Sequence, residues 1–320
     1  MRGRGLIFST LLLLGSVISG TADNGWERQI LSATEENDLT ACTDRHYTQG
    51  IRLTYLSRDD ALPRWLEKFS NFLPSPGLEV QARKFGIGVG QEIYTPADLK
   101  TARLITDDRP YAGWLFTSLT LQRRGEVSPA WLAKEDLRLD VGTLGPESLA
   151  EAAQKAAHTK KPRGWKNQLD TEVAFALRYQ RRYRYQFWHE DRWSAEILPV
   201  GRLNGGTVDT SLGVGGMLRS GYHIPNEFEA ATQPTATYYG VYLFSSADGQ
   251  YVIRNIFLDG NTFVTSHHVA KEPLVAELRA GVTVVLKSIE LTAAHTLRTR
   301  EFTQQRGNDS YSTAMVTVKF

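Results

Sequence analysis

A glutamine and a histidine on one predicted helix are the first residues of this chain whose spacing suggests chemistry. Gln154 and His158 lie one turn apart between residues 147 and 160, so their side chains share a face of that helix. A histidine with an ordinary pKa of about 6.5 is largely neutral at neutral pH and can accept a proton from water. The alternative is a solvated histidine at a helix C-terminus, where positive charge is favourable. Ser148 lies too far along the helix to act as a nucleophile beside His158.

A second polar cluster lies near the N-terminus and is rich in oxygen atoms. It contains Asn37 and Asp38 and then the run from Thr43 to Thr48, Thr-Asp-Arg-His-Tyr-Thr. Carboxylate and amide oxygens are the ligands that calcium prefers, but their spacing here is not that of an EF-hand. The cluster is therefore either part of a metal site or an acidic loop between the first two strands.

A third cluster combines acidic, basic and turn-forming residues. Asp107 to Trp114 reads Asp-Asp-Arg-Pro-Tyr-Ala-Gly-Trp, with Arg109 between the acids and the proline. Two interpretations fit this pattern. One is an ordinary turn that leads into a strand and holds an ion pair, and the other is an arginine that binds a phosphate. The residues alone leave both open.

Several classes of protein are excluded by what the chain lacks. It has no G-x-S-x-G nucleophile elbow, no H-E-x-x-H zinc motif and no glycine-rich phosphate loop. Its formal net charge of +2 gives no basic surplus for binding nucleic acid. The single cysteine, Cys42, cannot form an internal disulfide.

The N-terminus predicts export. Arg2 and Arg4 precede an apolar run from 6 to 18, and the small residues at 20–22 are typical of a signal peptidase site. We expect a signal peptide over residues 1–22. The apolar run is shorter than the roughly 20 residues that a membrane-spanning helix needs, which disfavours an anchor.

The remaining chain, 23–320, alternates apolar and polar residues with the period of a β-strand. From Leu274 to Lys287, for example, alanine, leucine and valine fall on one face and charged or small residues on the other. The run 249–259 also has strand character, but we treat it as an extension or a loop because bacterial single-chain barrels have even strand numbers. Twelve strands are predicted, near 27–36, 47–57, 83–94, 112–124, 135–144, 168–181, 191–203, 207–221, 236–247, 274–287, 288–302 and 310–320.

These strands predict an all-β fold, a transmembrane antiparallel β-barrel of about twelve strands in the outer membrane of a Gram-negative bacterium. The alternation continues to a terminal aromatic residue, Phe320, which resembles the signal that the outer-membrane insertion machinery reads. A helical insertion near 146–160, in an extracellular loop, breaks the pattern. Its small apolar side, formed by Leu149, Ala150, Ala153 and Ala157, would allow close packing on the barrel wall. Insertions on a rigid scaffold tend to carry function.

Taken together and in order, the polar clusters resemble the outer-membrane lipid A 3′-O-deacylase family. The match covers residues 35 to about 185, and beyond that only the barrel strands correspond. His158 is followed by a short basic segment, where family members carry an acidic residue in a longer loop. The residues that carry the resemblance are Asn37-Asp38, Thr43 to Gly50, Gln91 to Pro96, Asp107 to Gly113, Gly145-Pro146, Gln154, His158 and Trp165 to Gln168.

The resemblance implies an esterase that removes the 3′-O-linked acyloxyacyl chain of lipid A in the outer leaflet. It implies that His158 activates water as the general base while a calcium ion supplies the oxyanion hole. By position, Gln154, Asn37, Asp38 and Thr48 line the site, and Asp38 is the expected calcium ligand.

Charge alone suggests which residues meet the lipid A phosphates. Arg109, Lys100 and Lys160 are the basic residues that we expect to pair with them. Two other readings stay open. One is a non-enzymatic pore or adhesin of the outer membrane, and the other is an outer-membrane phospholipase, which would need a serine nucleophile beside a histidine.

Overall fold

The computed structural model describes residues 28–38, 46–157, 161–228 and 239–320. The predicted signal peptide, His158 and Lys160 therefore lie outside the described residues. None of the helices in the described part is long and apolar enough to cross a membrane.

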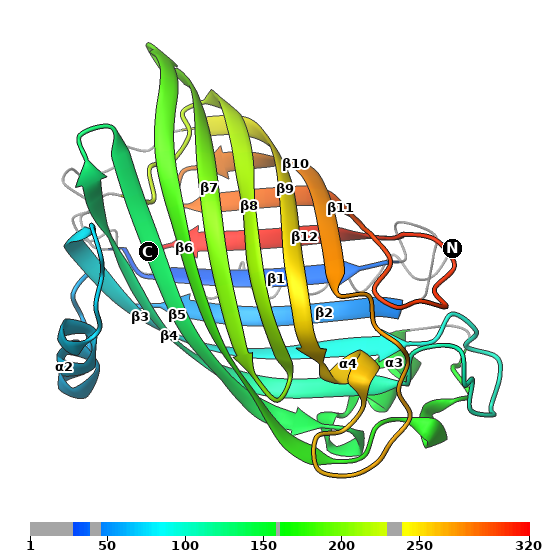
Figure 1. The fold of residues 1–320 in the computed structure, drawn as a ribbon. Helices are drawn as coiled ribbons and strands as arrows, with labels where there is room; N and C mark the ends of the chain where they lie inside the picture. Colours follow the sequence, from blue (N-terminus) through cyan, green and yellow to red (C-terminus); the bar gives the residue numbers. More distant parts are fainter. Residues whose placement is uncertain (1–27, 39–45, 158–160, 229–238) are drawn as a thin grey trace.

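The described chain forms a closed antiparallel barrel of twelve strands, in which each strand pairs with its neighbours in sequence and β1 pairs with β12 (Figure 1). The strands are β1 (Ile30–Asn37), β2 (His46–Leu56), β3 (Glu79–Thr95), β4 (Ala112–Ser128), β5 (Trp131–Leu144), β6 (Glu172–Glu190), β7 (Trp193–Gly206), β8 (Asp209–Tyr222), β9 (Tyr239–Asn255), β10 (Leu274–Leu286), β11 (Ile289–Arg298) and β12 (Asp309–Lys319). Closure pairs every strand edge and so leaves none exposed.

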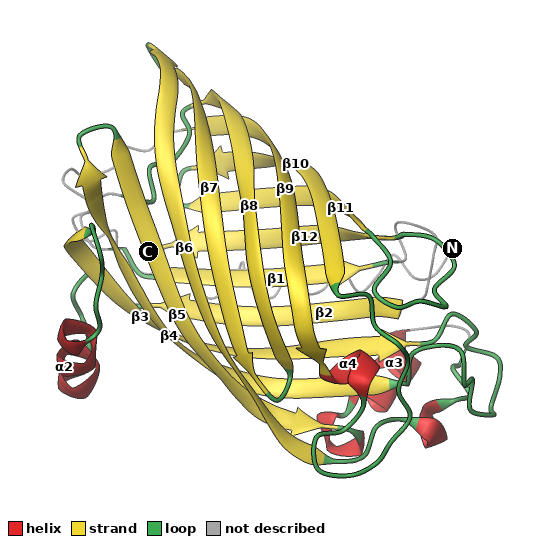
Figure 2. Cartoon of the chain, viewed as in Figure 1, coloured by secondary structure: helices red, strands yellow, loops and turns green. Residues whose placement is uncertain are grey.

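Few helices accompany the barrel, and all lie at its ends (Figure 2). They are α2 (Arg64–Phe72), the 3-10 turn η2 (Pro146–Ser148), α3 (Ala150–Ala157), the 3-10 turn η3 (Trp165–Asn167) and the short α4 (Ile256–Asp259).

Alternation along each strand places apolar side chains on the outer face of the barrel and polar side chains in its lumen. On β4, Leu115 and Leu119 point to the outer face, whereas Ser118 and Gln122 point inward and bond to acids of β5. The outer face carries a band of exposed apolar side chains, which include Ile51, Leu53, Ile87, Val89, Leu139, Val141, Val173, Phe175, Leu177, Leu203, Leu212, Val214, Leu243, Leu278 and Leu291. Charged pairs fill the lumen, among them Arg178 with Asp140 and Arg202 with Asp248.

The two ends of the barrel differ. We call the end that holds the paired residues Gln29 and Phe320 the terminal end. Three of its connections, 129–130, 191–192 and 287–288, are two residues long. The opposite end, here the loop end, carries the long connections 96–111, 145–171, 256–273 and 299–308, whereas the terminal end also has a long connection between β2 and β3, 57–78.

The twelve predicted strands are confirmed, with shifts at their ends. The run 249–259 is an extension, as expected, because β9 continues to Asn255 before α4 begins. Strand β6 extends to Glu190, well past the predicted end at 181. The insertion near 146–160 is helical where it is described, as η2 and α3. Helix α2 was not expected from the sequence.

Candidate active site on the outer face of the barrel

Helix α3 packs directly on the outer face of β3 and β4 at the loop end. Ala150 is 1% exposed and belongs to an apolar cluster with Ile93, Tyr111 and Trp165. The contact is close because Gly113 faces it, and a Cβ at Gly113 would lie 2.1 Å from the Ala150 Cβ. The next residue, Trp114, stacks on Phe116 in the interior cluster, so alternation turns Gly113 outward. The small side of α3 therefore lies against the outer wall, as predicted for Ala150 and Ala153, whereas Leu149, predicted for the same side, precedes α3 and is 60% exposed.

The helix places a buried amide beside this wall. Gln154 is 0% exposed, and its Oε1 accepts a hydrogen bond of 2.8 Å from the indole Nε1–H of Trp165. This bond fixes the orientation of the amide, so Nε2 is the group left to donate. Within the described residues Nε2 has no hydrogen-bond partner. Buried donors are rarely left without a partner, which makes this nitrogen a candidate for binding a substrate or water. His158 follows one turn later in the sequence, outside the described residues.

Thr48 lies on the same outer face, on the neighbouring strand. It is the extra residue of a bulge in β2, between Tyr47, which pairs with Tyr94, and Gln49, which pairs with Ile93. Its hydroxyl is 2.8 Å from that of Thr95, and it is 0% exposed. Because Thr95 and Ile93 share a face of β3, Thr48 lies on the side of the wall where α3 packs.

Asn37 and Asp38 end β1 beside this region. Asn37 pairs with Gln49, while the preceding Glu36 accepts a hydrogen bond of 2.6 Å from the lumenal Tyr47 hydroxyl. Alternation therefore turns Asn37 toward the outer face. Asp38 comes directly after the strand and is 1% exposed. The structure thus brings Asn37, Thr48 and Gln154 to one face of the wall. The resemblance implied that these three residues line one site.

Of the three basic residues expected to meet phosphates, Arg109 and Lys100 lie in the described part of the chain, and they occupy different environments. Arg109 is 0% exposed, donates to Glu301 at 3.1 Å and stacks 4.8 Å above the Tyr94 ring, all on the lumenal side. These contacts are those of an internal ion pair. Lys100 is exposed in the connection 96–111, where its backbone N–H donates to Asp98. Of the two, only Lys100 has a side chain that a bulky lipid headgroup can reach.

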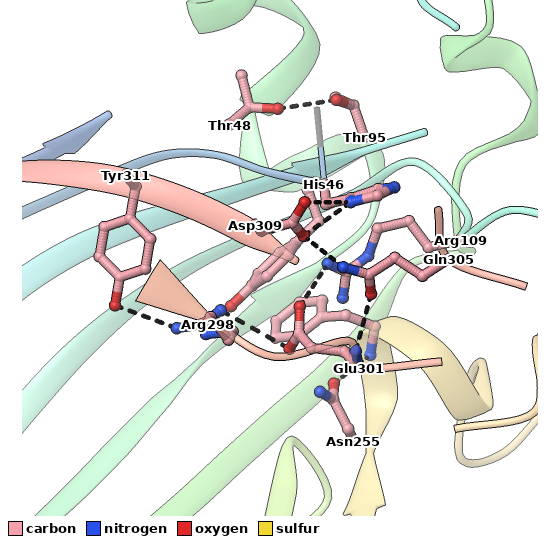
Figure 3. A network of polar contacts seen from close by, with 12 residues as sticks. His46, Thr48, Thr95, Arg109, Asn255, Arg298, Glu301, Gln305, Asp309 and Tyr311 are labelled. Carbon is pink, nitrogen blue, oxygen red and sulfur yellow. Dashed lines mark hydrogen bonds and ion pairs between the residues drawn. The ribbon is translucent and has the colours of Figure 1, made fainter. Parts of the chain in front are cut away.

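A buried polar network, which no sequence pattern predicts, lies at the loop end of the lumen (Figure 3). The His46 Nδ1 lies 2.7 Å from Asp309 Oδ2, which also accepts a bond of 2.9 Å from Gln305. Deeper in, Arg298 donates to the Tyr311 hydroxyl at 3.2 Å. His46 and Asp309 are 263 positions apart, so only the closure of the barrel brings them together.

Two carboxyl groups of this network, both in loops, are held in the charged form. Burial would raise the pKa of Glu301, but the adjacent Arg109 and Arg298 lower it below its usual value. Burial likewise opposes ionisation of Asp108, and hydrogen bonds from His46 and the Ala97 N–H lower its pKa. Both groups therefore favour a closed loop end at neutral pH.

The lumen below the network contains a cavity of about 310 Å³ with charges of both signs. Arg52, Glu92, Arg178 and Asp209 are among its lining residues. Phe257 of α4 stacks on Tyr94 at 3.9 Å over this cavity. The polar lumen and the outer-face cluster are thus separated by the wall of β2, β3 and β4.

Comparisons with known proteins identify the family. The family model described as outer membrane protein LpxR matches residues 6–320. Among solved structures, LpxR from Salmonella typhimurium has a TM-score of 0.72 and 18% identity, covering 91% of this chain and 100% of that chain. The autotransporter β domain of Bordetella BrkA gives a TM-score of 0.44 at 11% identity, covering 93% and 100%. No curated protein sequence matches. The Salmonella likeness supports the fold, and the family match shows that this chain belongs to the LpxR family of outer membrane proteins.

Proposed function

We propose that this protein hydrolyses the 3′-O-linked acyl ester of lipid A at the outer face of its barrel. The observation that carries the proposal is the buried Gln154 amide, which Trp165 orients on a helix packed against the lipid-facing wall. A polar group buried on that face is costly unless it serves a ligand. A lipid substrate reaches such a site without leaving the membrane.

The side of the membrane fits this substrate. Outer-membrane barrels have short periplasmic turns and longer extracellular loops. The loop end, which holds α3 and Thr48, therefore faces the outside, and its wall contacts the outer leaflet. Lipid A occupies that leaflet. We expect Lys100, which is exposed at the same end, to pair with a phosphate of the lipid.

The proposed reaction is direct hydrolysis by water. His158 accepts a proton from water as the water oxygen attacks the ester carbonyl carbon. The bond between the carbonyl carbon and the sugar oxygen then breaks, and the proton passes from His158 to that leaving oxygen. The products are a free fatty acid and a lipid A hydroxyl. The Gln154 amide N–H holds the ester in place for attack, because its oxygen is already bonded to Trp165.

The oxygen donors beside α3 suit a calcium ion. Asp38 offers a buried carboxylate, and Asn37 and Thr48 offer an amide and a hydroxyl oxygen, all hard ligands of the kind calcium prefers. Among the described residues, no group of three or more His, Cys, Asp or Glu side chains could hold a metal ion. A calcium site here would therefore depend on neutral oxygens such as those of Asn37 and Thr48. A calcium ion bound there would stabilise negative charge on the ester carbonyl oxygen.

Ser148 is disfavoured as a nucleophile by its surroundings. It is 0% exposed and its hydroxyl donates to the Gly145 carbonyl at 2.5 Å, so it serves the turn before α3. A serine does lie beside a histidine elsewhere on the outer face, where the His295 Nδ1 is 3.1 Å from the Ser312 hydroxyl, and the phospholipase alternative would use this pair. A pore is disfavoured because ion pairs and the His46 network fill the loop end of the lumen.

The test is mass spectrometry of lipid A from a Gram-negative host that expresses the protein. Wild type and His268→Ala, an exposed histidine at the same end, should both remove the mass of the 3′ acyl group. His158→Ala should lose about a thousandfold in rate, the range of general base catalysis. Chelation of calcium should also stop the reaction. Unchanged lipid A with folded wild-type protein in the outer membrane would overturn the proposal.

A further inference from the structure

Helix α2, near the terminal end, has three distinct faces. Leu66 and Ser70 are buried on one side. Trp65, Phe69 and Phe72 share a second side, by their spacing of four and three residues, and are 57%, 42% and 83% exposed. The third side is polar and exposed and carries Arg64, Glu67, Lys68 and Asn71. An exposed aromatic stripe with polar residues beside it is typical of a surface that binds a membrane or another molecule.

The segment that contains α2 is fastened to the outer face of the barrel. Arg123 of β4 points outward, as Leu115 and Leu119 do, and donates to the carbonyls of Ser70, Leu73 and Pro74 at 2.9 to 3.3 Å. Ser75 donates to Glu135 at 2.9 Å. These bonds hold the C-terminal end of α2 on the side of the wall that faces lipid.

The point of attachment is the edge of the apolar band. On β4, β5 and β6 the outward residues from the loop end down to Leu121, Leu137 and Leu177 carry no charge, and all but Thr117 and Thr143 are apolar or glycine. The next outward positions toward the terminal end include Arg123, Glu135 and Arg181, which pair with one another at 2.8 and 3.3 Å. Arg181 also donates to the Pro76 carbonyl at 2.7 Å. The segment 64–76 thus covers a charged row where the lipid-facing surface ends.

Other aromatic side chains lie exposed near the same end of the barrel. They belong to the terminal ends of β6, β7 and β9 and are Phe187, Trp188, Trp193 and Tyr239. Such a belt is typical of the level at which acyl chains meet headgroups. In Figure 1, α2 lies beside the barrel at this end, next to β3 and β4.

We propose that α2 is an in-plane membrane helix that inserts Trp65, Phe69 and Phe72 into the periplasmic leaflet of the outer membrane. The occupant of the aromatic face is the phospholipid surface, since the face continues the apolar band of the barrel. Arg64 and Lys68 flank the aromatic stripe and pair with lipid phosphates, while Glu67 and Asn71 face water. The helix fixes the depth of the barrel on this side and shields the charged row from lipid.

Site-directed spin labelling of the full-length protein in phosphatidylethanolamine–phosphatidylglycerol vesicles tests this inference. Single cysteines replace Phe69 or Phe72 in a Cys42→Ser background, and Glu67 and Asn71 are the matched control positions. All four side chains are exposed, so labelling does not disturb a packed core. Collisions with oxygen, which enters the bilayer, are compared with collisions with a water-soluble nickel chelate.

The expected result is that labels at Phe69 and Phe72 collide several-fold more with oxygen than with nickel, relative to labels at Glu67 and Asn71. Equal access of nickel to all four positions would place the helix in water and overturn the proposal. Protection of Phe69 and Phe72 from both reagents would instead show a protein partner on this face and would also overturn it. Neither outcome depends on whether the protein cleaves lipid A.

Discussion

The two helices on the outer wall, α3 at the loop end and α2 near the terminal end, are eight and nine residues long but use the wall in opposite ways. Helix α3 presents alanines to the wall and approaches Gly113 so closely that no Cβ fits between them. This close packing buries a polar side chain, Gln154, against the barrel. Helix α2 is held by its backbone carbonyls and directs its largest side chains away from the wall.

Under the two proposals, one scaffold makes two kinds of lipid contact. Small residues bring α3 near the wall and bury a polar side chain there, where we propose that a single ester group binds. Large aromatic residues pointing outward make a broad apolar surface, which suits a bilayer rather than one ligand. The predictions that follow alter one helix at a time and ask whether the other is affected.

Arg123→Ala is expected to give the largest effect, a loss of about 3 kcal/mol in the free energy of unfolding. The change leaves Glu135 buried with one cation fewer and releases the carbonyls at the end of α2. Guanidinium unfolding of the refolded protein in detergent measures it. Arg58→Ala, an exposed arginine at the same end, is the control and should change stability by less than about 0.5 kcal/mol. Equal stability of the two variants would show that α2 is not held by Arg123.

Gly113→Ala should lower the rate of lipid A deacylation about a hundredfold, the cost of displacing a positioned group by about 1 Å. The added methyl would lie 2.1 Å from the Ala150 Cβ and 2.2 Å from the Ser148 Oγ, so α3 must move. Gly249→Ala is the matched control, since its Cβ would meet no atom within 4 Å. Rates are compared by mass spectrometry of lipid A. Full activity of Gly113→Ala would show that catalysis does not depend on the close contact between α3 and Gly113.

Trp165→Phe should reduce the same rate about fivefold, because one neutral hydrogen bond contributes about 1 kcal/mol. The ring still packs against Ile93 and Ala150, but the amide of Gln154 is no longer oriented. Trp131→Phe, an aromatic residue at the terminal end, should leave the rate unchanged. An unchanged rate in Trp165→Phe, equal to that in Trp131→Phe, would contradict the orienting role of the indole N–H.

The smallest expected effect concerns pH and the closed loop end. The pKa of Glu301 is lowered from its usual 4.5, so its ion pairs stabilise the connection 299–308 above that pH. As the pH falls through the lowered pKa, the carboxylate is protonated and this stabilisation is lost. After correction for the intrinsic exchange rate at each pH, the protection of the amides in 299–308 should therefore fall as the pH is lowered from neutral through the depressed pKa of Glu301. In Glu301→Gln the protection should already be lower at neutral pH and should depend less on pH.

Much of the fold followed from the sequence because alternation is a local signal. The period of two residues marked all twelve strands, and the alanines of α3 marked a helix against a wall. Helix α2 was missed although Trp65, Phe69 and Phe72 recur at helical spacing, because one nine-residue segment is short beside the two-residue period of the strands on either side. The charged row under α2 was missed for a different reason. Arg123, Glu135 and Arg181 belong to three strands and meet only in the sheet.

The site was predicted unevenly. Gln154 and Thr48 lie on the outer face of the wall on which α3 packs, and their role in a shared site stays a prediction. Arg109 was expected from its charge to bind phosphate, but its partner Glu301 is 192 positions away and was not foreseeable from neighbouring residues. The same holds for the contact of His46 with Asp309. Long-range ion pairs depend on strand register, which composition and motifs do not specify.

The most direct test of the central claim asks on which side of the wall the ester is cleaved. Purified wild type, Gln154→Ala and Asn204→Ala are compared for release of the 3′ acyl chain from lipid A in vesicles. Asn204 lines the lumenal cavity, whereas Gln154 is buried beside the outer wall. A loss of at least about tenfold in Gln154→Ala, with Asn204→Ala unchanged, is the predicted result. Loss of activity in Asn204→Ala with full activity in Gln154→Ala would place the reaction in the lumen and contradict the outer-face site.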